Sequence, residues 1–185
     1  MLVPATTPTP ESANGAAPPF EQVFADHGAQ VWRALRRLGV DALDVDDVFQ
    51  EVFATIHRRL PTFGGRSALS TWIYGICVHK AWAHRRTTRR RREELGAAPP
   101  EPFMEAPQLD QLQRRRALAF ADALLDTLDD DKRAVFVLYE IEEMPMKEVA
   151  EAVGCPLQTA YARLHAARLQ FEAALRRAGA QGRTP

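Results

Sequence analysis

The sequence predicts an all-α fold made of two small helical domains joined by a flexible linker. Apolar residues recur at helical spacing through both halves of the 185-residue chain, and 46% of its residues are hydrophobic. Proline-rich stretches without such a pattern occupy residues 1–19 and 96–108. We therefore expect a disordered tail (1–19), a first domain (20–95), a linker (96–112), a second domain (113–178) and a short tail (179–185).

The first two elements are predicted as amphipathic helices. The first begins at Phe20, has apolar residues at spacings of three, four and seven, and ends at Gly39. The second carries one unbroken apolar stripe from Val45 to Ile56, with Asp44 as a suitable N-cap. Asp47, Gln50 and Glu51 lie on the opposite, polar face of this helix.

A third helix follows the break made by Pro61 and the glycines at 64 and 65. Ser70 or Thr71 is its expected cap, and its apolar stripe includes Trp72, which we place in the core. The helix ends in a run of six Arg within residues 85–92. Such a run is either a solvated helix end or a set of phosphate contacts.

The second half contains four more predicted helical segments: residues 118–128, a segment capped by Asp131, residues 146–153 with Pro145 in the first turn, and residues 157–178. The last two, separated by Gly154, have the small and apolar residues of a helix-turn-helix. We expect Val149, Val153 and Leu164 to face inward. Six polar or aromatic residues face outward: Gln158, Thr159, Tyr161, Arg163, His165 and Arg168. They suit a DNA major groove, although a plain helical hairpin with a solvated face has the same pattern.

Composition excludes several other classes of protein. Cys77 and Cys155 are far apart and read as two buried thiols, and the five His show no zinc spacing, so neither a metal nor a cofactor is expected. No long apolar run or secretion signal is evident, which indicates a soluble cytoplasmic protein. The net charge of zero hides a segregation of charge along the chain. Residues 61–95 carry eight basic and two acidic side chains, residues 96–131 carry three and eight, and residues 152–185 carry five and one. Two basic zones of this kind suit phosphate partners.

Several motifs, in order, resemble the extracytoplasmic-function sigma factors of bacteria. "DVDDVFQEVFATIHRRLPTF" and "SALSTWIYGICVHKAWAHRR" are similar to their region 2, and "LLDTLDDDKRAVFVLYEIEEMPMKEVAEAVGCPLQTAYARLHAARLQF" is similar to their region 4. The resemblance covers residues 20–177. It implies a non-enzymatic factor that brings RNA polymerase core to promoters, with a linker in place of the region 3 of larger sigma factors.

The resemblance also implies partners and contact residues. Asp47, Gln50 and Glu51 would dock on the clamp helices of the largest polymerase subunit, although composition alone reads this face equally well as solvated. The helix after Gly154 would bind the -35 element through the six outward residues named above, and an anti-sigma factor would regulate the chain, which has no expected small-molecule substrate. The loop after Phe63 and the third helix would open the -10 element and hold a flipped base. The residues expected there are Arg66, Ser67, Tyr74, His79, Lys80, Trp82, Arg85 and Arg86.

The chain departs from the family pattern at three positions. His79 and Ala83 stand where relatives commonly have Asn and Asp, and Gly75 stands where Arg is usual. The common -10 base preferences therefore do not carry over, and His79 is either a base contact or a partly exposed helix residue.

Two other functions compete with the sigma-factor interpretation. A conventional helix-turn-helix regulator would bind a palindromic operator without polymerase. A metal hydrolase would use Asp46, Asp47 and Glu51 with a His, but these carboxylates follow the polar side of a helix and lack a convergent pocket.

Overall fold

The computed structural model describes residues 17–95, 117 and 119–181, and the regular structure within them is helical. The expected linker at 96–112 and most of both expected tails lie outside these residues. Ala17, which we expected in the tail, packs against the core, and Pro19 precedes the first helix. Within the described part of the chain, no helix has the length and apolar character that a membrane span needs.

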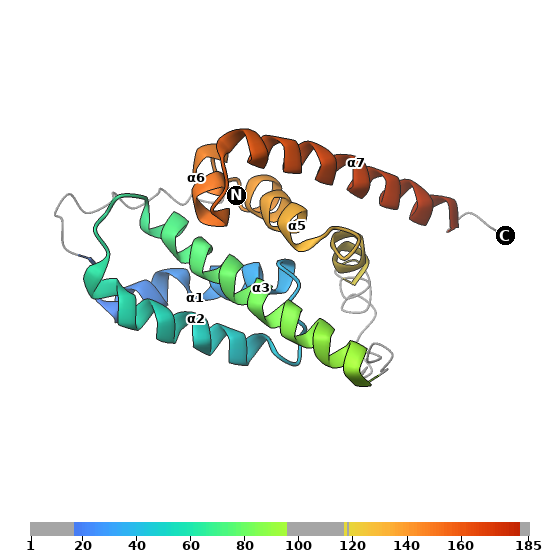
Figure 1. Cartoon of the computed structure of the whole chain (residues 1–185). Coiled ribbons are helices and arrows are strands. Elements are labelled where there is room, and N and C mark those ends of the chain that lie inside the picture. The colour runs from blue at the N-terminus through green and yellow to red at the C-terminus, as the bar shows by residue number, and fades with distance from the viewer. Residues whose placement is uncertain (1–16, 96–116, 118, 182–185) are drawn as a thin grey trace, which may run out of the picture.

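Three helices form the N-terminal part: α1 (Phe20–Arg37), α2 (Val45–Arg59) and α3 (Leu69–Leu95), with a 3-10 turn, η1 (Leu60–Thr62), after α2. α1 and α2 pack on each other and α3 lies across both (Figure 1). The predicted apolar stripes are confirmed, because Val31 and Leu35 of α1 and Val52 and Ile56 of α2 are at most 1% exposed.

The helix ends differ in detail from the predictions. Gly39 terminates α1 as expected and has a φ of 93°, a conformation that glycine adopts readily. Asp44 precedes α2, but its side chain makes no capping hydrogen bond, and its carboxylate lies 3.3 Å from the imidazole of His84. Neither Ser70 nor Thr71 caps α3, because the helix already begins at Leu69.

The C-terminal part contains a helical stretch at 119–125, then α5 (Asp130–Phe136), a π-helical turn η2 (Val137–Ile141), α6 (Met146–Val153) and α7 (Leu157–Gln181). The predicted cap of α5 is wrong: Asp129, not Asp131, accepts the hydrogen bond from the Lys132 amide, at 2.9 Å. Asp131 lies in the first turn of the helix instead. α7 continues three residues beyond the expected boundary at 178.

α6 and α7 form the predicted helix-turn-helix. Gly154 ends α6 in the left-handed conformation, with a φ of 69°. Val149, Val153 and Leu164 are at most 4% exposed, so the apolar side of the pair faces the rest of the C-terminal part as expected. The outer side of α7 stays accessible, since Tyr161 is 51% exposed.

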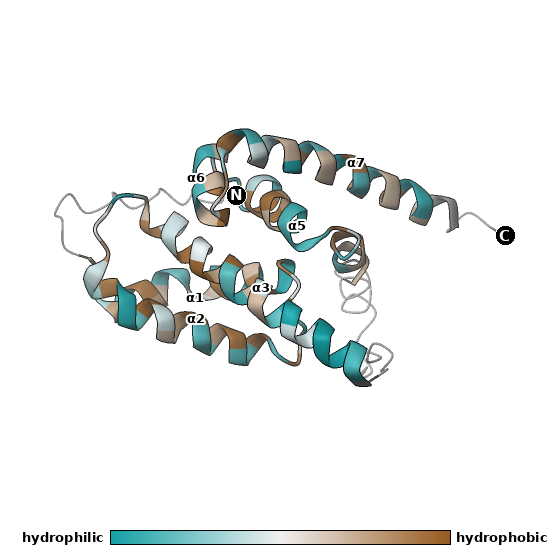
Figure 2. Cartoon of the chain, in the orientation of Figure 1, coloured by the Kyte–Doolittle hydropathy of each residue, from teal (hydrophilic) through white to brown (hydrophobic). Residues whose placement is uncertain are grey.

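The two helical parts pack directly on each other rather than lying apart on a tether. α6 and α5 cover one side of α3, and α1 and α2 cover the other (Figure 1). The buried apolar residues of both parts form one continuous cluster. The C-terminal end of α3, with its Arg run, is strongly hydrophilic (Figure 2).

Candidate functional site

An apolar groove lies between α1 and α2, lined by the rings of Phe20, Phe24, Phe49 and Phe53. Its volume is about 710 Å³, and the Phe24 and Phe53 ring centroids are 4.8 Å apart in an edge-on arrangement. Phe24 is 46% exposed, which is unusual for a large apolar side chain. The i, i+4 spacing of Phe on two neighbouring helices was the sequence signal for this groove, and our sequence analysis did not use it.

Two of the three residues expected to dock on polymerase form the rim of this groove. Gln50 and Glu51 both line it, and both are exposed, as is Asp47 on the same helix. Lys80, which we expected near the -10 element, lies at the same rim, with its Nζ 2.9 Å from the Glu51 carboxylate. The groove therefore joins an apolar floor to a charged edge.

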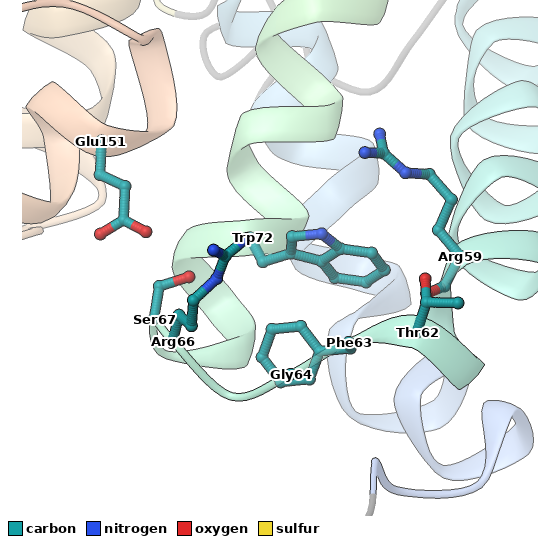
Figure 3. A pocket seen from close by; sticks show the side chains of 8 residues that line it. All are labelled: Arg59, Thr62, Phe63, Gly64, Arg66, Ser67, Trp72 and Glu151. Carbon is teal, nitrogen blue, oxygen red and sulfur yellow. The ribbon is translucent and has the colours of Figure 1, made fainter.

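A smaller pocket opens at the loop between η1 and α3, with a volume of about 220 Å³. Phe63 and Trp72 form its aromatic wall, with ring centroids 5.2 Å apart. Arg66 and Ser67, both predicted contacts of the -10 element, line it as well (Figure 3). The remaining lining residues are Arg59, Thr62, Gly64 and Glu151. Trp72 is only partly buried, although its helical spacing predicted a position in the core.

The other predicted -10 residues fall on two sides of α3. His79 and Arg86 are exposed, and the His79 ring lies edge-on to Trp82 at 5.6 Å. Tyr74, Trp82 and Arg85 instead face the C-terminal part. Tyr74, expected to be open for stacking on bases, is only 7% exposed, and its hydroxyl donates to the Glu142 carboxylate at 2.6 Å.

Trp82 and Arg85 are held by the start of α5. The indole of Trp82 donates to the Asp130 carbonyl at 3.1 Å, and Arg85 donates to the Asp130 carboxylate at 2.6 Å. Burial raises the pKa of Tyr74, and its hydrogen bond to Glu142 raises it further, so this phenol stays protonated. The aromatic and cationic groups on this side of α3 are thus occupied within the chain.

The outer face of α7 presents four of its six predicted residues without an ion pair among the described residues: Gln158, Thr159, Tyr161 and His165. The two Arg are paired within the C-terminal part. Arg163 bonds to Asp131, and Arg168 bonds to Glu140 at 2.6 Å while lying over the Tyr139 ring. Two acidic side chains, those of Asp131 and Glu140, therefore lie at the edge of this face.

One buried arginine joins the two parts of the chain. Arg133 of α5 is 1% exposed, donates to the Arg37 carbonyl at the end of α1 at 2.6 Å, and pairs with Asp126. Burial lowers its pKa, and the Asp126 carboxylate opposes that shift. A cation at the carbonyl end of α1 is favourable because the helix dipole is negative there.

Two family models match the chain and together account for both helical parts. The model for Sigma-70 region 2 matches residues 23–91, and the model for Sigma-70, region 4 matches residues 121–171. The ECF RNA polymerase sigma-E factor of Escherichia coli (strain K12) is 30% identical over 134 residues, which cover 68% of this chain and 70% of that protein. The RNA polymerase sigma factor CnrH of Cupriavidus metallidurans is 29% identical over 177 residues, 89% of this chain and 91% of that one.

One solved structure supports the same family, and a second shares the fold. CnrH in complex with the cytosolic domain of CnrY has a TM-score of 0.65 and 27% identity, and the match covers 84% of this chain and 86% of that one. The sigma factor RpoE in complex with the anti-sigma factor NepR from Bartonella quintana has a TM-score of 0.70 at 18% identity, covering 85% and 96%. That second likeness concerns the fold alone. The resemblance and the all-helical fold predicted from the sequence are confirmed, a conventional regulator is not favoured, and the chain belongs to the extracytoplasmic-function sigma factors of RNA polymerase.

Proposed function

We propose that the chain acts in the cytoplasm as a non-catalytic initiation factor that carries RNA polymerase core to particular promoters. The observation that supports this most is the presence of three distinct surfaces on one chain. They are the phenylalanine groove with its polar rim, the aromatic pocket beside α3, and the outer face of α7. Each has the chemistry of a different ligand.

The groove and its rim are the proposed docking surface for the polymerase clamp helices. An apolar floor buries one or two anchoring side chains of a partner helix, and Asp47, Gln50 and Glu51 supply carboxylate and amide acceptors for its basic residues. The Glu51–Lys80 pair has to open or be shared on docking, and the cost is small because Glu51 is well exposed.

The loop pocket is the proposed receptor for a base flipped out of the -10 element. Its volume of about 220 Å³ is below the roughly 300 Å³ at which pockets for larger organic ligands begin, so it suits a single planar base. Phe63 and Trp72 offer rings for stacking, Arg59 and Arg66 offer cations for the adjacent phosphates, and Ser67 offers a hydroxyl.

The outer face of α7 is the proposed reader of the -35 element. Gln158, Thr159, Tyr161 and His165 are available for base edges and phosphates. Arg163 and Arg168 have to exchange Asp131 and Glu140 for DNA groups, so part of their contact energy is spent on breaking those pairs. Their net contribution is therefore smaller than that of an unpaired Arg.

An anti-sigma factor is the proposed regulatory partner. One solved sigma factor is described in complex with the anti-sigma factor NepR, and CnrH is described in complex with the cytosolic domain of CnrY. The same groove and α7 face are the surfaces that such a protein has to cover to block polymerase and promoter together.

The test is transcription in vitro with bacterial core polymerase and a library of promoter fragments. We expect start sites that depend on the added chain. Replacing both Gln50 and Glu51 by Lys should weaken binding to core by about 100-fold, the loss of two contacts of roughly 1.5 kcal/mol each. The matched control replaces Gln170 and Glu172, exposed on α7, by Lys. Equal affinity of core for both double variants would remove the docking assignment, and absence of dependent start sites would remove the proposed function.

A further inference from the structure

We propose that this chain closes over its own -10 surface and that Gly75 is the position that permits closure. The covered surface is the side of α3 that faces α5 and α6, and closure competes with promoter DNA for it. The competition with DNA rests on the function proposed above, whereas the closed contact itself does not.

The covered residues of α3 form one continuous stripe. Thr71, Tyr74, Val78, Trp82 and Arg85 recur at spacings of three or four, so they share one face of the helix. Thr71 is 1% exposed and its hydroxyl donates to Glu148 of α6. The same face bears the Tyr74, Trp82 and Arg85 contacts described above, all made with the C-terminal part.

Gly75 lies in the middle of this stripe and faces Ala152 of α6. A Cβ atom at Gly75 would stand 3.4 Å from the Ala152 carbonyl oxygen and 3.7 Å from its Cα. Those are ordinary contact distances, so an alanine fits, whereas the atoms of a longer side chain have to find room beside the Ala152 backbone. The residue that relatives commonly have here, Arg, would have to place its long side chain beside the backbone of α6. The departure from the family pattern at this position therefore has a structural consequence.

The acidic side chains of the C-terminal part take the places of phosphates. Asp130 bonds to Arg85 at 2.6 Å, Glu142 bonds to Arg37 at 2.6 Å, and Asp122 lies 3.3 Å from Arg36. Guanidinium groups bind carboxylates and phosphates in the same geometry. A strand of DNA on this side of α3 would have to displace these carboxylates.

The loop pocket is also affected by closure. Glu151 of α6 lies at its edge, across from Arg66 and Ser67 (Figure 3). A carboxylate in this position repels an incoming phosphate while the chain is closed. Movement of α6 away from α3 would remove both the cover on Tyr74 and this charge.

The closed state can be measured by energy transfer between two dyes on the full-length chain. Ala29 of α1 and Gln170 of α7 are exposed and accept cysteine substitutions, with Cys155→Ser removing the half-buried thiol. Cys77 can stay, because it is fully buried and burial raises its pKa to about 12. Gly75→Arg is the test variant. Gly75→Ala is the matched control, because both substitutions raise the helix propensity of α3 while only Arg has to place a long side chain beside α6.

We expect one high-transfer population for the wild type and Gly75→Ala, and its loss in Gly75→Arg. Glu142→Lys reverses the charge opposite Arg37 and should open the chain by a change in the C-terminal part. It is the replacement test variant if Gly75→Arg does not fold. A single-stranded DNA of about 12 random nucleotides is the binding probe. If about 90% of the wild type is closed, both open variants bind it about tenfold more tightly.

Unchanged energy transfer in both variants would overturn the closed contact. Lost transfer without tighter DNA binding would overturn the competition between closure and DNA. Failure of the proposed function is seen separately, as absence of start sites in the transcription assay, and leaves the energy-transfer result intact.

Discussion

Removal of a single oxygen atom from Tyr74 should shift the chain toward an open arrangement. The Tyr74 ring is buried at the boundary between α3 and the C-terminal part, and its hydroxyl donates to Glu142 Oε2 at 2.6 Å. The other oxygen of Glu142 accepts from Arg37, also at 2.6 Å. In Tyr74→Phe the ring keeps its apolar contacts, and Glu142 keeps its arginine but loses one donor.

The size of the effect follows from the type of bond that is lost. A hydrogen bond to a charged group contributes about 1.5–3 kcal/mol, because a carboxylate left without its donor inside a protein keeps its desolvation cost. Both partners regain water when the two parts separate, so the loss weakens docking and leaves each part folded. The ratio of closed to open chains should therefore fall by about 10- to 150-fold.

Energy transfer between Ala29 and Gln170 measures this ratio directly, and hydrogen exchange along α3 provides a second measure. Tyr161→Phe is the matched control, because it removes the same atom from a half-exposed ring on the outer face of α7. We expect faster exchange at the start of α3 and a larger low-transfer population only in Tyr74→Phe. If both Phe variants match the wild type within twofold, the bond does not hold the two parts together.

Two further substitutions test local features of the C-terminal part. Asp129→Ala removes the cap of α5 and should lower the free energy of unfolding by about 1 kcal/mol at pH 7, measured by urea denaturation. Burial raises the pKa of Asp129, but the hydrogen bonds from Lys132 outweigh burial, so the pKa in the folded chain is lower than the ordinary value of 3.8. The stabilisation is therefore fully present above pH 3.8 and is lost as the pH falls through the lower pKa of the folded chain. If the difference in free energy of unfolding between the wild type and Asp129→Ala became larger in acid, the capping role would be refuted. Glu143 has a φ of 55°, which a glycine adopts without strain. The free energy of unfolding of Glu143→Gly should therefore exceed that of Glu143→Ala by about 1 kcal/mol in the same urea titration. Equal free energies of unfolding would show that the turn is unstrained.

Most helices could be predicted from the sequence because their signals are local. The stripe from Val45 to Ile56 repeats with the helical period, and Gly154 stands where a helix must end in a left-handed residue. The capping residue of α5 was harder to predict from local signals. Three consecutive Asp at 129–131 are nearly equal candidates, and Asp129 is the one whose side chain accepts the hydrogen bond from the Lys132 amide.

The covered surface of α3 shows where local patterns stop being informative. Thr71 and Tyr74 are polar or amphipathic, and a polar residue on a helix is usually read as facing water. Their partners, Glu148 and Glu142, come from about 70 residues further along the chain. No periodicity within α3 contains that information, and the meaning of Gly75 depends on the same distant segment.

The exposure of single site residues could be predicted from the sequence, whereas contacts between helices could not. Gln50 and Glu51 are exposed as expected, and Arg66 and Ser67 do meet in one pocket. The pairing of Lys80 with Glu51 could not be predicted from the sequence, because Glu51 lies on another helix. The groove between α1 and α2 forms where a pair of Phe on α1 meets a pair of Phe on α2. That meeting depends on how the two helices pack, and the sequence of either helix alone does not give it.

The packed arrangement also accounts for the zero net charge of a chain with two basic zones. The acidic side chains of residues 122–142 do not simply face water, because Asp122, Asp130 and Glu142 each pair with an arginine of the N-terminal part. Each of these contacts is partly exposed, so added salt weakens it. The same salt weakens phosphate contacts, and more steeply, because binding to DNA releases condensed counterions whereas an internal ion pair releases none. Raising the ionic strength therefore opens the chain without helping it to bind DNA, and a protein partner that holds the two parts separated is the better route to the open form. The proposed docking of polymerase core at the α1–α2 groove, on the far side of α3, would let core be that partner without competing for the covered stripe.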